Sequence, residues 1–112
     1  MIAEVLKHGD HGGHGDIVPF SVTLEEKHRL DGIADKILDV AFNAHRQYGP
    51  GLLESALLIE DSVIVELKSC DKILPIHEAQ LLTYLKFSDK KLGFILNFKN
   101  RMFKDGIRRL MR

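Results

Sequence analysis

The chain has 112 residues, 45% of them hydrophobic and 29% charged, so it has room for one globular domain with one core. Its 16 basic residues balance its 16 acidic residues, which excludes a strongly basic protein drawn as a whole to nucleic acid. One cysteine excludes an intrachain disulfide, and no segment holds the roughly 20 apolar residues of a membrane span, so we expect a cytoplasmic protein.

The first 23 residues differ in composition from the rest of the chain. Residues 7–16 read KHGDHGGHGD, which is rich in glycine, histidine and aspartate and has no apolar periodicity. Such a segment buries too little surface to offset the entropy lost on ordering it. We therefore expect a flexible leader over residues 1–23 and one folded domain over residues 24–112.

A helix is predicted from Leu24 to about Gln47. Thr23 or Ser21 can cap its start, and the YGPG sequence at residues 48–51 ends it. Apolar residues recur at helical spacing along this stretch, at Leu30, Ile33, Ala34, Ile37, Leu38, Ala41 and Phe42.

The remaining elements alternate between strands and a second helix. Residues 57–59 (LLI) and 63–68 (VIVELK) predict two strands, and the polar triplet between them suits a hairpin loop. Pro75 suits the first turn of a helix, which the apolar spacing extends over residues 77–87. Residues 92–98 (LGFILNF) predict a buried strand, and residues 107–111 a final strand or a helical turn. This order indicates an α/β or α+β domain.

Glu66 and Lys68 end the second predicted strand and carry the first hint of chemistry. Side chains alternate across a strand, so both project from one face while Leu67 turns into the core. A carboxylate can hold a divalent cation there, and an ammonium can steady an attacking hydroxide or a phosphate. Taken alone, this E-x-K triplet equally fits an ion pair on a solvated face.

Four sequence blocks, one of which contains this triplet, make a functional interpretation of it more specific. They are AHRQYGPGLLES (residues 44–55), LLIEDSVIVELKS (57–69), LPIHEAQLLTYLKFSDKKLGFILNF (74–98) and KDGIRRL (104–110). In this order they resemble the GxxExxxE family, which is similar to PD-(D/E)XK nucleases. The resemblance implies a small mixed β-sheet flanked by helices, as in restriction endonucleases. It also implies a phosphodiesterase-type site that depends on a metal such as Mg²⁺, with DNA or RNA as the partner.

The resemblance also assigns residues. Glu54, with Gly51, matches the start of the G-x-x-E signature, and Glu66 and Lys68 match the (D/E)-x-K pair. It therefore implies Glu66 and Glu54 as metal ligands. Gln80 and Tyr84 match the Q-x-x-x-Y of the helix that faces the site in the family, and His77 and Glu78 open that helix. Judged by themselves, Tyr84 is a core or rim aromatic, and Gln80 and Glu78 belong to a solvated face.

The departures from the family concern the acidic cluster. In the family, several dozen residues separate GPGLLES from the hairpin, whereas here the two blocks are fused, so the resemblance implies a core lacking part of its sheet and its second helix. Ala56 stands where the first catalytic aspartate belongs, and Leu58 where the second glutamate of the signature belongs. Loss of one electrostatic contributor typically lowers the rate by about 10²–10³-fold.

Three hypotheses follow for the function. The first is a nuclease-like domain that is catalytically impaired and survives as a nucleic-acid-binding remnant. The second is an active Mg²⁺-dependent nuclease that uses Glu54, Glu66 and Lys68. The third is a small interaction module that forms a homodimer through an exposed sheet edge.

Overall fold

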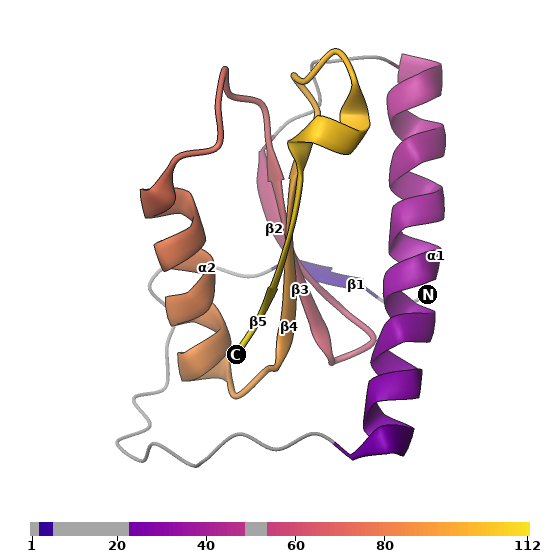
Figure 1. The fold of residues 1–112 in the computed structure, drawn as a ribbon, viewed down its shortest axis with the longest axis vertical. Coiled ribbons are helices and arrows are strands. Elements are labelled where there is room, and N and C mark those ends of the chain that lie inside the picture. Colours follow the sequence, from indigo (N-terminus) through magenta and orange to yellow (C-terminus); the bar gives the residue numbers. More distant parts are fainter. Residues whose placement is uncertain (1–2, 6–22, 49–53) are drawn as a thin grey trace.

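The computed structural model describes residues 3–5, 23–48 and 54–112. One five-stranded sheet, in the order β1-β2-β3-β4-β5, stands between two helices that cover its opposite faces (Figure 1). The strands are β1 (Ala3–Val5), β2 (Ser55–Ile59), β3 (Val63–Lys68), β4 (Leu92–Asn97) and β5 (Ile107–Met111). The helices are α1 (Leu24–Tyr48), α2 (Pro75–Ser88) and the short 3-10 helix η1 (Phe103–Gly106). The predicted class, a small mixed sheet flanked by helices, is confirmed.

The sheet is mixed because one of its connections is a helical crossover. β3 and β4 run parallel and are joined through α2, while the pairs β1/β2, β2/β3 and β4/β5 are antiparallel. A parallel pair needs such a crossover, whereas the antiparallel pair β2/β3 needs only a tight turn. The residues of that turn, Glu60 and Asp61, both have positive φ angles, of 54° and 51°.

Helix α1 forms as its apolar periodicity predicts, from Leu24 to Tyr48. The backbone N–H of Glu26 donates a hydrogen bond to Thr23 Oγ1 at 3.1 Å, which identifies Thr23 as the N-cap; the alternative, Ser21, lies outside the described residues. The buried face of α1 packs on one side of the sheet, where the cluster comprises Leu30, Ala34, Ile37, Ala41, Ile59, Val63, Val65, Leu92, Phe94, Leu96, Phe98 and Phe103.

Helix α2 covers the other side of the sheet with a smaller apolar cluster, formed by Leu58, Ile64, Ile73, Leu81, Leu85 and Ile95. Gly93 on β4 permits a close approach of the helix. A Cβ atom at that position would lie 2.9 Å from Leu81 Cδ1. Because side chains alternate along β3, the strand sends Val65 towards α1 and Ile64 towards α2. Glu66 and Lys68 share the parity of Ile64 and therefore lie on the α2 side.

The strand β1 lies within the predicted leader. Of the predicted flexible leader, the structure describes Ala3–Val5 and Thr23, and Ala3–Val5 pairs antiparallel with β2. The division into a leader and a folded domain stays a prediction, and the histidine- and glycine-rich segment lies outside the described residues. Since β1 covers β2, the edges of the sheet are β1 and β5. No helix in the described part of the chain is long and apolar enough to cross a membrane.

Candidate active site

A small cavity of about 70 Å³ opens at the carboxyl end of β3. Its lining residues come from the start of β2 and the end of β3, and they are Glu54, Ser55, Ala56, Glu66, Leu67 and Lys68. The β2/β3 hairpin brings these two segments together because its register pairs Ala56 with Glu66 and Ser55 with Leu67. Three residues singled out from the sequence, Glu54, Glu66 and Lys68, therefore meet at one place.

Glu66 is a buried carboxylic acid within an apolar strand. Only 5% of the residue is exposed, and its neighbour across the ladder, Ala56, is 4% exposed. On the other side Glu66 is in register with Ile95, which in turn is in register with Arg108 of β5. A buried carboxylate is costly unless it is paired, hydrogen-bonded or bound to a metal. Ala56 contributes no polar atom to this row, although it stands directly opposite the acid.

Lys68 and Glu54 form a loose ion pair at the mouth of the cavity. Lys68 Nζ lies 3.7 Å from Glu54 Oε2, with the two side chains 22% and 53% exposed. A pair this long and this exposed contributes little to stability. Its ammonium and carboxylate groups are thus held near Glu66 without being committed to each other.

The α2 residues implied by the resemblance do not line this cavity. Gln80 is exposed, and Tyr84 is half-buried against the apolar cluster under α2. His77 Nδ1 accepts a hydrogen bond from the backbone N–H of Leu74 at 3.0 Å, so this histidine caps its own helix. Glu78 Oε1 lies 3.9 Å from Arg108 Nε on the neighbouring strand β5.

Sequence reasoning missed one polar residue beside the site, Asn97. This last residue of β4 is completely buried and is in register with Lys68 on the parallel strand. A single asparagine at the end of an apolar run carries no distinctive pattern. Its burial beside the E-x-K pair becomes visible only once β3 and β4 are known to be parallel neighbours.

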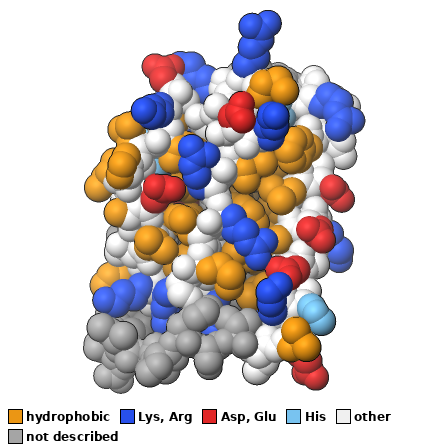
Figure 2. All heavy atoms as spheres, viewed as in Figure 1, with side chains coloured by type: hydrophobic (Ala, Val, Ile, Leu, Met, Phe, Trp, Pro, Cys, Tyr) orange, Lys and Arg blue, Asp and Glu red, His pale blue; other side chains and the backbone are white. Residues whose placement is uncertain are grey.

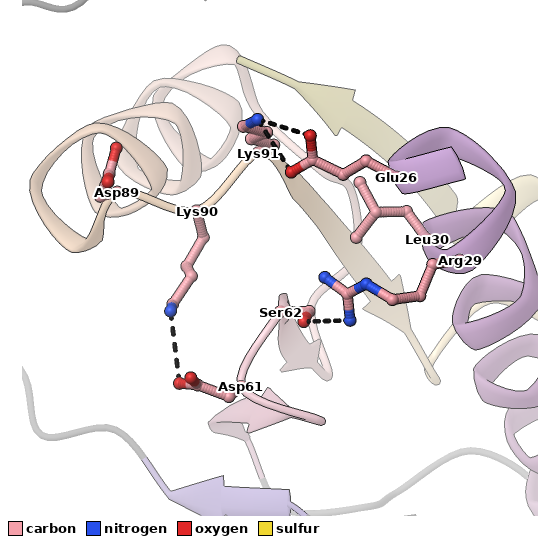
Figure 3. Close-up of a pocket in the computed structure, with 8 residues that line it drawn as sticks. All are labelled: Glu26, Arg29, Leu30, Asp61, Ser62, Asp89, Lys90 and Lys91. Atoms are coloured by element: carbon pink, nitrogen blue, oxygen red, sulfur yellow. Dashed lines mark hydrogen bonds and ion pairs between the residues drawn. The ribbon is translucent and has the colours of Figure 1, made fainter. Parts of the chain in front are cut away.

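A larger cavity, of about 170 Å³, lies at the opposite end of β3 and contrasts with the first. Figure 3 shows its side chains reaching towards one another from α1, the β2/β3 turn and the segment after α2. The hydrogen bonds and ion pairs run from Arg29 to Ser62 (2.8 Å), from Lys90 to Asp61 (3.3 Å), from Lys91 to Glu26 (2.8 Å) and from Arg112 to Asp89 (3.3 Å). Three of these four contacts pair a cation with an acid, and Arg29 donates to a neutral hydroxyl, so the contacts around the cavity tie α1, the β2/β3 turn and the segment after α2 together.

The C-terminal stretch, residues 99–112, is rich in lysine and arginine, and most of these basic side chains are paired with acids. Figure 2 shows lysines and arginines interleaved with acids and apolar side chains, without a continuous basic patch on that face. Arg109 lies 2.9 Å from Asp31 of α1 and over the ring of Phe94. Lys99 pairs with Asp71, and its hydrogen bond lowers the pKa of the Asp71 carboxyl below the ordinary 3.8.

The two carboxylates at the smaller cavity could hold a divalent cation, but they do not form a closed metal cage. Mg²⁺ is usually held through one or two carboxylates, with waters and substrate phosphates completing the shell. Glu66 and Glu54 offer two carboxylates on one cavity, whereas Ala56 offers none. Within residues 23–48 and 54–112, no group of three or more histidine, cysteine, aspartate or glutamate side chains is arranged to hold a metal.

One family of known proteins matches the part of the chain that forms most of the lining of the smaller cavity. A family model described as the PD-(D/E)XK nuclease superfamily matches residues 55–110, half of the chain. The matched region runs from the start of β2 almost to the end of β5 and includes Ala56, Glu66, Lys68 and the whole of α2. No curated protein and no solved structure matches the chain.

Proposed function

Because the chain belongs to the PD-(D/E)XK nuclease superfamily, we propose that it is a nuclease-like domain whose phosphodiester-hydrolysing site is catalytically impaired. The observation that carries this proposal is the pairing of Ala56 with Glu66 across the β2/β3 hairpin, both buried and both lining the small cavity. The position that would carry the lost carboxylate is thus the cross-strand partner of Glu66. The superfamily uses divalent metals, and Mg²⁺ is the ion that these oxygen donors fit best.

Each remaining residue has a role that its chemistry supports. Glu66 would hold the metal from the floor of the cavity, and Glu54 would add a second carboxylate from its rim. A divalent cation bound there would stabilise charge on the phosphate. The ammonium of Lys68 would orient the attacking water or neutralise a phosphate oxygen. To do so, it would break its loose ion pair with Glu54.

Restoring the lost acid is the decisive experiment. We expect Ala56→Asp to bind Mg²⁺ roughly tenfold more tightly than the wild type in calorimetry of the full chain, because affinity follows the number of charged ligands. Glu66→Gln should abolish binding. Mg²⁺ is the ion to use in this titration. The histidines of the first sixteen residues bind Mg²⁺ poorly, whereas they could bind a softer ion and obscure the result.

A matched control places the same charge one residue away. Ser55→Asp adds a carboxylate at a strand position of opposite parity, paired with Leu67 rather than with Glu66. Because Ser55 also lines the cavity, this variant should raise Mg²⁺ affinity slightly, and much less than Ala56→Asp does. Equal gains in Ala56→Asp and Ser55→Asp would mean that added charge alone attracts the ion, and the proposed site would be wrong.

The second candidate, an active Mg²⁺-dependent nuclease, is favoured by the 3.7 Å approach of Glu54 to Lys68. If Glu54 replaces the lost aspartate, the wild type cleaves DNA or RNA and Glu54→Gln abolishes the cleavage. In an impaired site the wild type cleaves neither substrate, and Ala56→Asp gains activity by up to about 10²–10³-fold. Assays with single- and double-stranded oligonucleotides separate the two candidates.

If the site is catalytically impaired, the protein would bind nucleic acid without cleaving it. The signature of this binding is an affinity for DNA or RNA oligonucleotides that falls as salt rises. Neutralising Lys68 should weaken such binding more than neutralising Arg109, because Lys68 lines the cavity and Arg109 is paired with Asp31 at 2.9 Å. An affinity insensitive to salt would contradict this part of the proposal.

The homodimer hypothesis finds less support from the sheet. An antiparallel pairing of two β5 edges would bring the arginines at positions 108 and 109 of both copies close together. Like charges that face each other across a strand pair are destabilising. Light scattering at micromolar concentration should therefore show a monomer.

A further inference from the structure

Asn97 holds the chain segment that directly follows Lys68. Its Nδ2 donates to the carbonyl oxygen of Cys70 at 2.8 Å, and its Oδ1 accepts from the N–H of Cys70 at 3.0 Å. The side-chain amide thus bonds both backbone groups of a residue that lies beyond the end of β3, as a neighbouring strand would do. The N–H of Phe98 also donates to the carbonyl oxygen of Lys68 at 2.9 Å. The backbone is thus held at the Lys68 carbonyl group and again two residues later at Cys70.

The same amide is anchored to the turn after β4. Its Nδ2 donates to Asn100 Oδ1 at 2.7 Å, and its Oδ1 accepts from the N–H of Lys99 at 3.4 Å. His45 Nε2 of α1 lies 2.8 Å from the carbonyl oxygen of Asn100. We call Asn97, Cys70 and Asn100, with these bonds, the Asn97 clamp. It connects the loop after β3 to the turn after β4 and, through His45, to α1.

The clamp explains why a polar side chain is kept in a completely buried position. A buried amide is costly unless its donors and acceptors are satisfied, and here both ends of the amide are used. The ends of strands are where local opening is easiest. Lys68 is the last residue of β3, so without the clamp its backbone would be the first part of the site to open.

We propose that Asn97 is the positioning residue for Lys68, holding the lysine ammonium at the cavity shared with Glu54 and Glu66. A displacement of about 1 Å is enough to spoil the alignment of such a group with a phosphate or water. What Lys68 does there rests on the proposed function. The position of the Lys68 side chain is a property of the protein alone, so it can be probed without nucleic acid or metal.

Acetylation of lysines, followed by mass spectrometry of the full chain, measures that position. Asn97→Leu keeps a side chain of similar size and removes all four hydrogen bonds of the amide. Lys68 should then be acetylated roughly tenfold faster, because unsatisfied buried groups shift local opening by about that factor. Lys91, which is likewise paired with an acid and is 28% exposed against 22% for Lys68, should react at an unchanged rate.

Two further variants protect the test. Asn100→Ala removes only the hydrogen bond from Asn97 Nδ2 to Asn100 Oδ1. It should accelerate the acetylation of Lys68 by a smaller factor than Asn97→Leu does. This variant serves as the test if Asn97→Leu does not fold. Ile37→Val weakens the core on the α1 side without touching the clamp and should accelerate neither lysine selectively. The single cysteine, Cys70, offers a second reporter, since its thiol should react faster with a disulfide reagent when the clamp opens.

The outcomes separate this proposal from the proposed function. A selective rise at Lys68 and Cys70 supports the clamp even if the wild type binds no Mg²⁺, which would count against the function alone. An equal rise at Lys68 and Lys91 would mean general loosening of the fold and would overturn the positioning role. An unchanged Lys68 in folded Asn97→Leu or Asn100→Ala would overturn it as well.

Discussion

The two ends of β3 each border a cavity, and they handle charge in different ways. At the turn end, the larger cavity is crossed by hydrogen bonds and ion pairs that match each cation with an acceptor. At the carboxyl end, the smaller cavity keeps a buried Glu66, a loosely paired Lys68 and a buried clamp behind them. Cavity volume is therefore a poor guide in this molecule, and the two ends differ in how their charged groups are buried and paired.

The largest effect that sharpens this contrast is expected at Gly106. A Cβ there would lie 2.5 Å from the backbone oxygen of Asn97 and 2.8 Å from Asn100 Oδ1. Gly106→Ala should therefore lower the free energy of unfolding by about 2 kcal/mol in urea denaturation. Gly32→Ala on α1, where a Cβ meets nothing within 4 Å, is the control and should raise it by about 0.5–1 kcal/mol. Equal effects at both positions would mean that the clamp region is not tightly packed.

At the turn end, the backbone rather than the side chains limits stability. Asp61 has a φ of 51°, a conformation that costs L-residues other than glycine about 1 kcal/mol or more. Asp61→Gly should raise the free energy of unfolding by about 1 kcal/mol, because its pair with Lys90 is exposed and contributes little. Lys90→Gln, which removes the pair but leaves the turn, should change stability far less. A loss of stability in Asp61→Gly would show that the pair outweighs the strain.

Arg29 tests whether the larger cavity takes any part in binding. Its guanidinium donates to Ser62 Oγ at 2.8 Å and so ties α1 to the β2/β3 turn. Arg29→Gln should lower the free energy of unfolding by about 0.5 kcal/mol, the low end for one hydrogen bond. Its affinity for Mg²⁺ and oligonucleotides should equal that of the wild type. If the affinity for Mg²⁺ and oligonucleotides fell in Arg29→Gln and persisted in Glu66→Gln, the binding site would lie at the larger cavity, and the role proposed for the smaller cavity would be wrong.

The smallest effect is a dependence on pH at the turn end. The hydrogen bond from Lys91 lowers the pKa of the Glu26 carboxyl below its ordinary value of 4.5. The ionised form is therefore favoured in the folded state, and its contribution is complete above pH 4.5 and is lost as the pH falls through the lowered pKa. The stability difference between wild type and Glu26→Gln should be constant from neutral pH to about 5 and shrink below it. A difference that grew on acidification would contradict the assigned direction.

The fold was largely predictable from local patterns, and the site was predictable only in part. Apolar periodicity located α1, and the β-branched run VIVELK located β3, because both elements pack an apolar face against a neighbour. β1 was missed because three residues carry no period and depend on a partner strand distant in sequence. The family resemblance implied that Glu54 and Lys68 share one site, whereas the clamp around Asn97 depends on the parallel register of β3 and β4.

The pairing of β1 with β2 has a consequence for how the protein acquires its structure during synthesis. The register joins Ala3 to Ile59, so β1 is synthesised well before the strand it pairs with and must wait until β2 has emerged. Closing so long a loop is entropically costly, and we expect β1 to dock late and to show the weakest amide protection among the strands. The central strands β3 and β4, joined through α2, would then form the nucleus onto which the rest of the sheet is added.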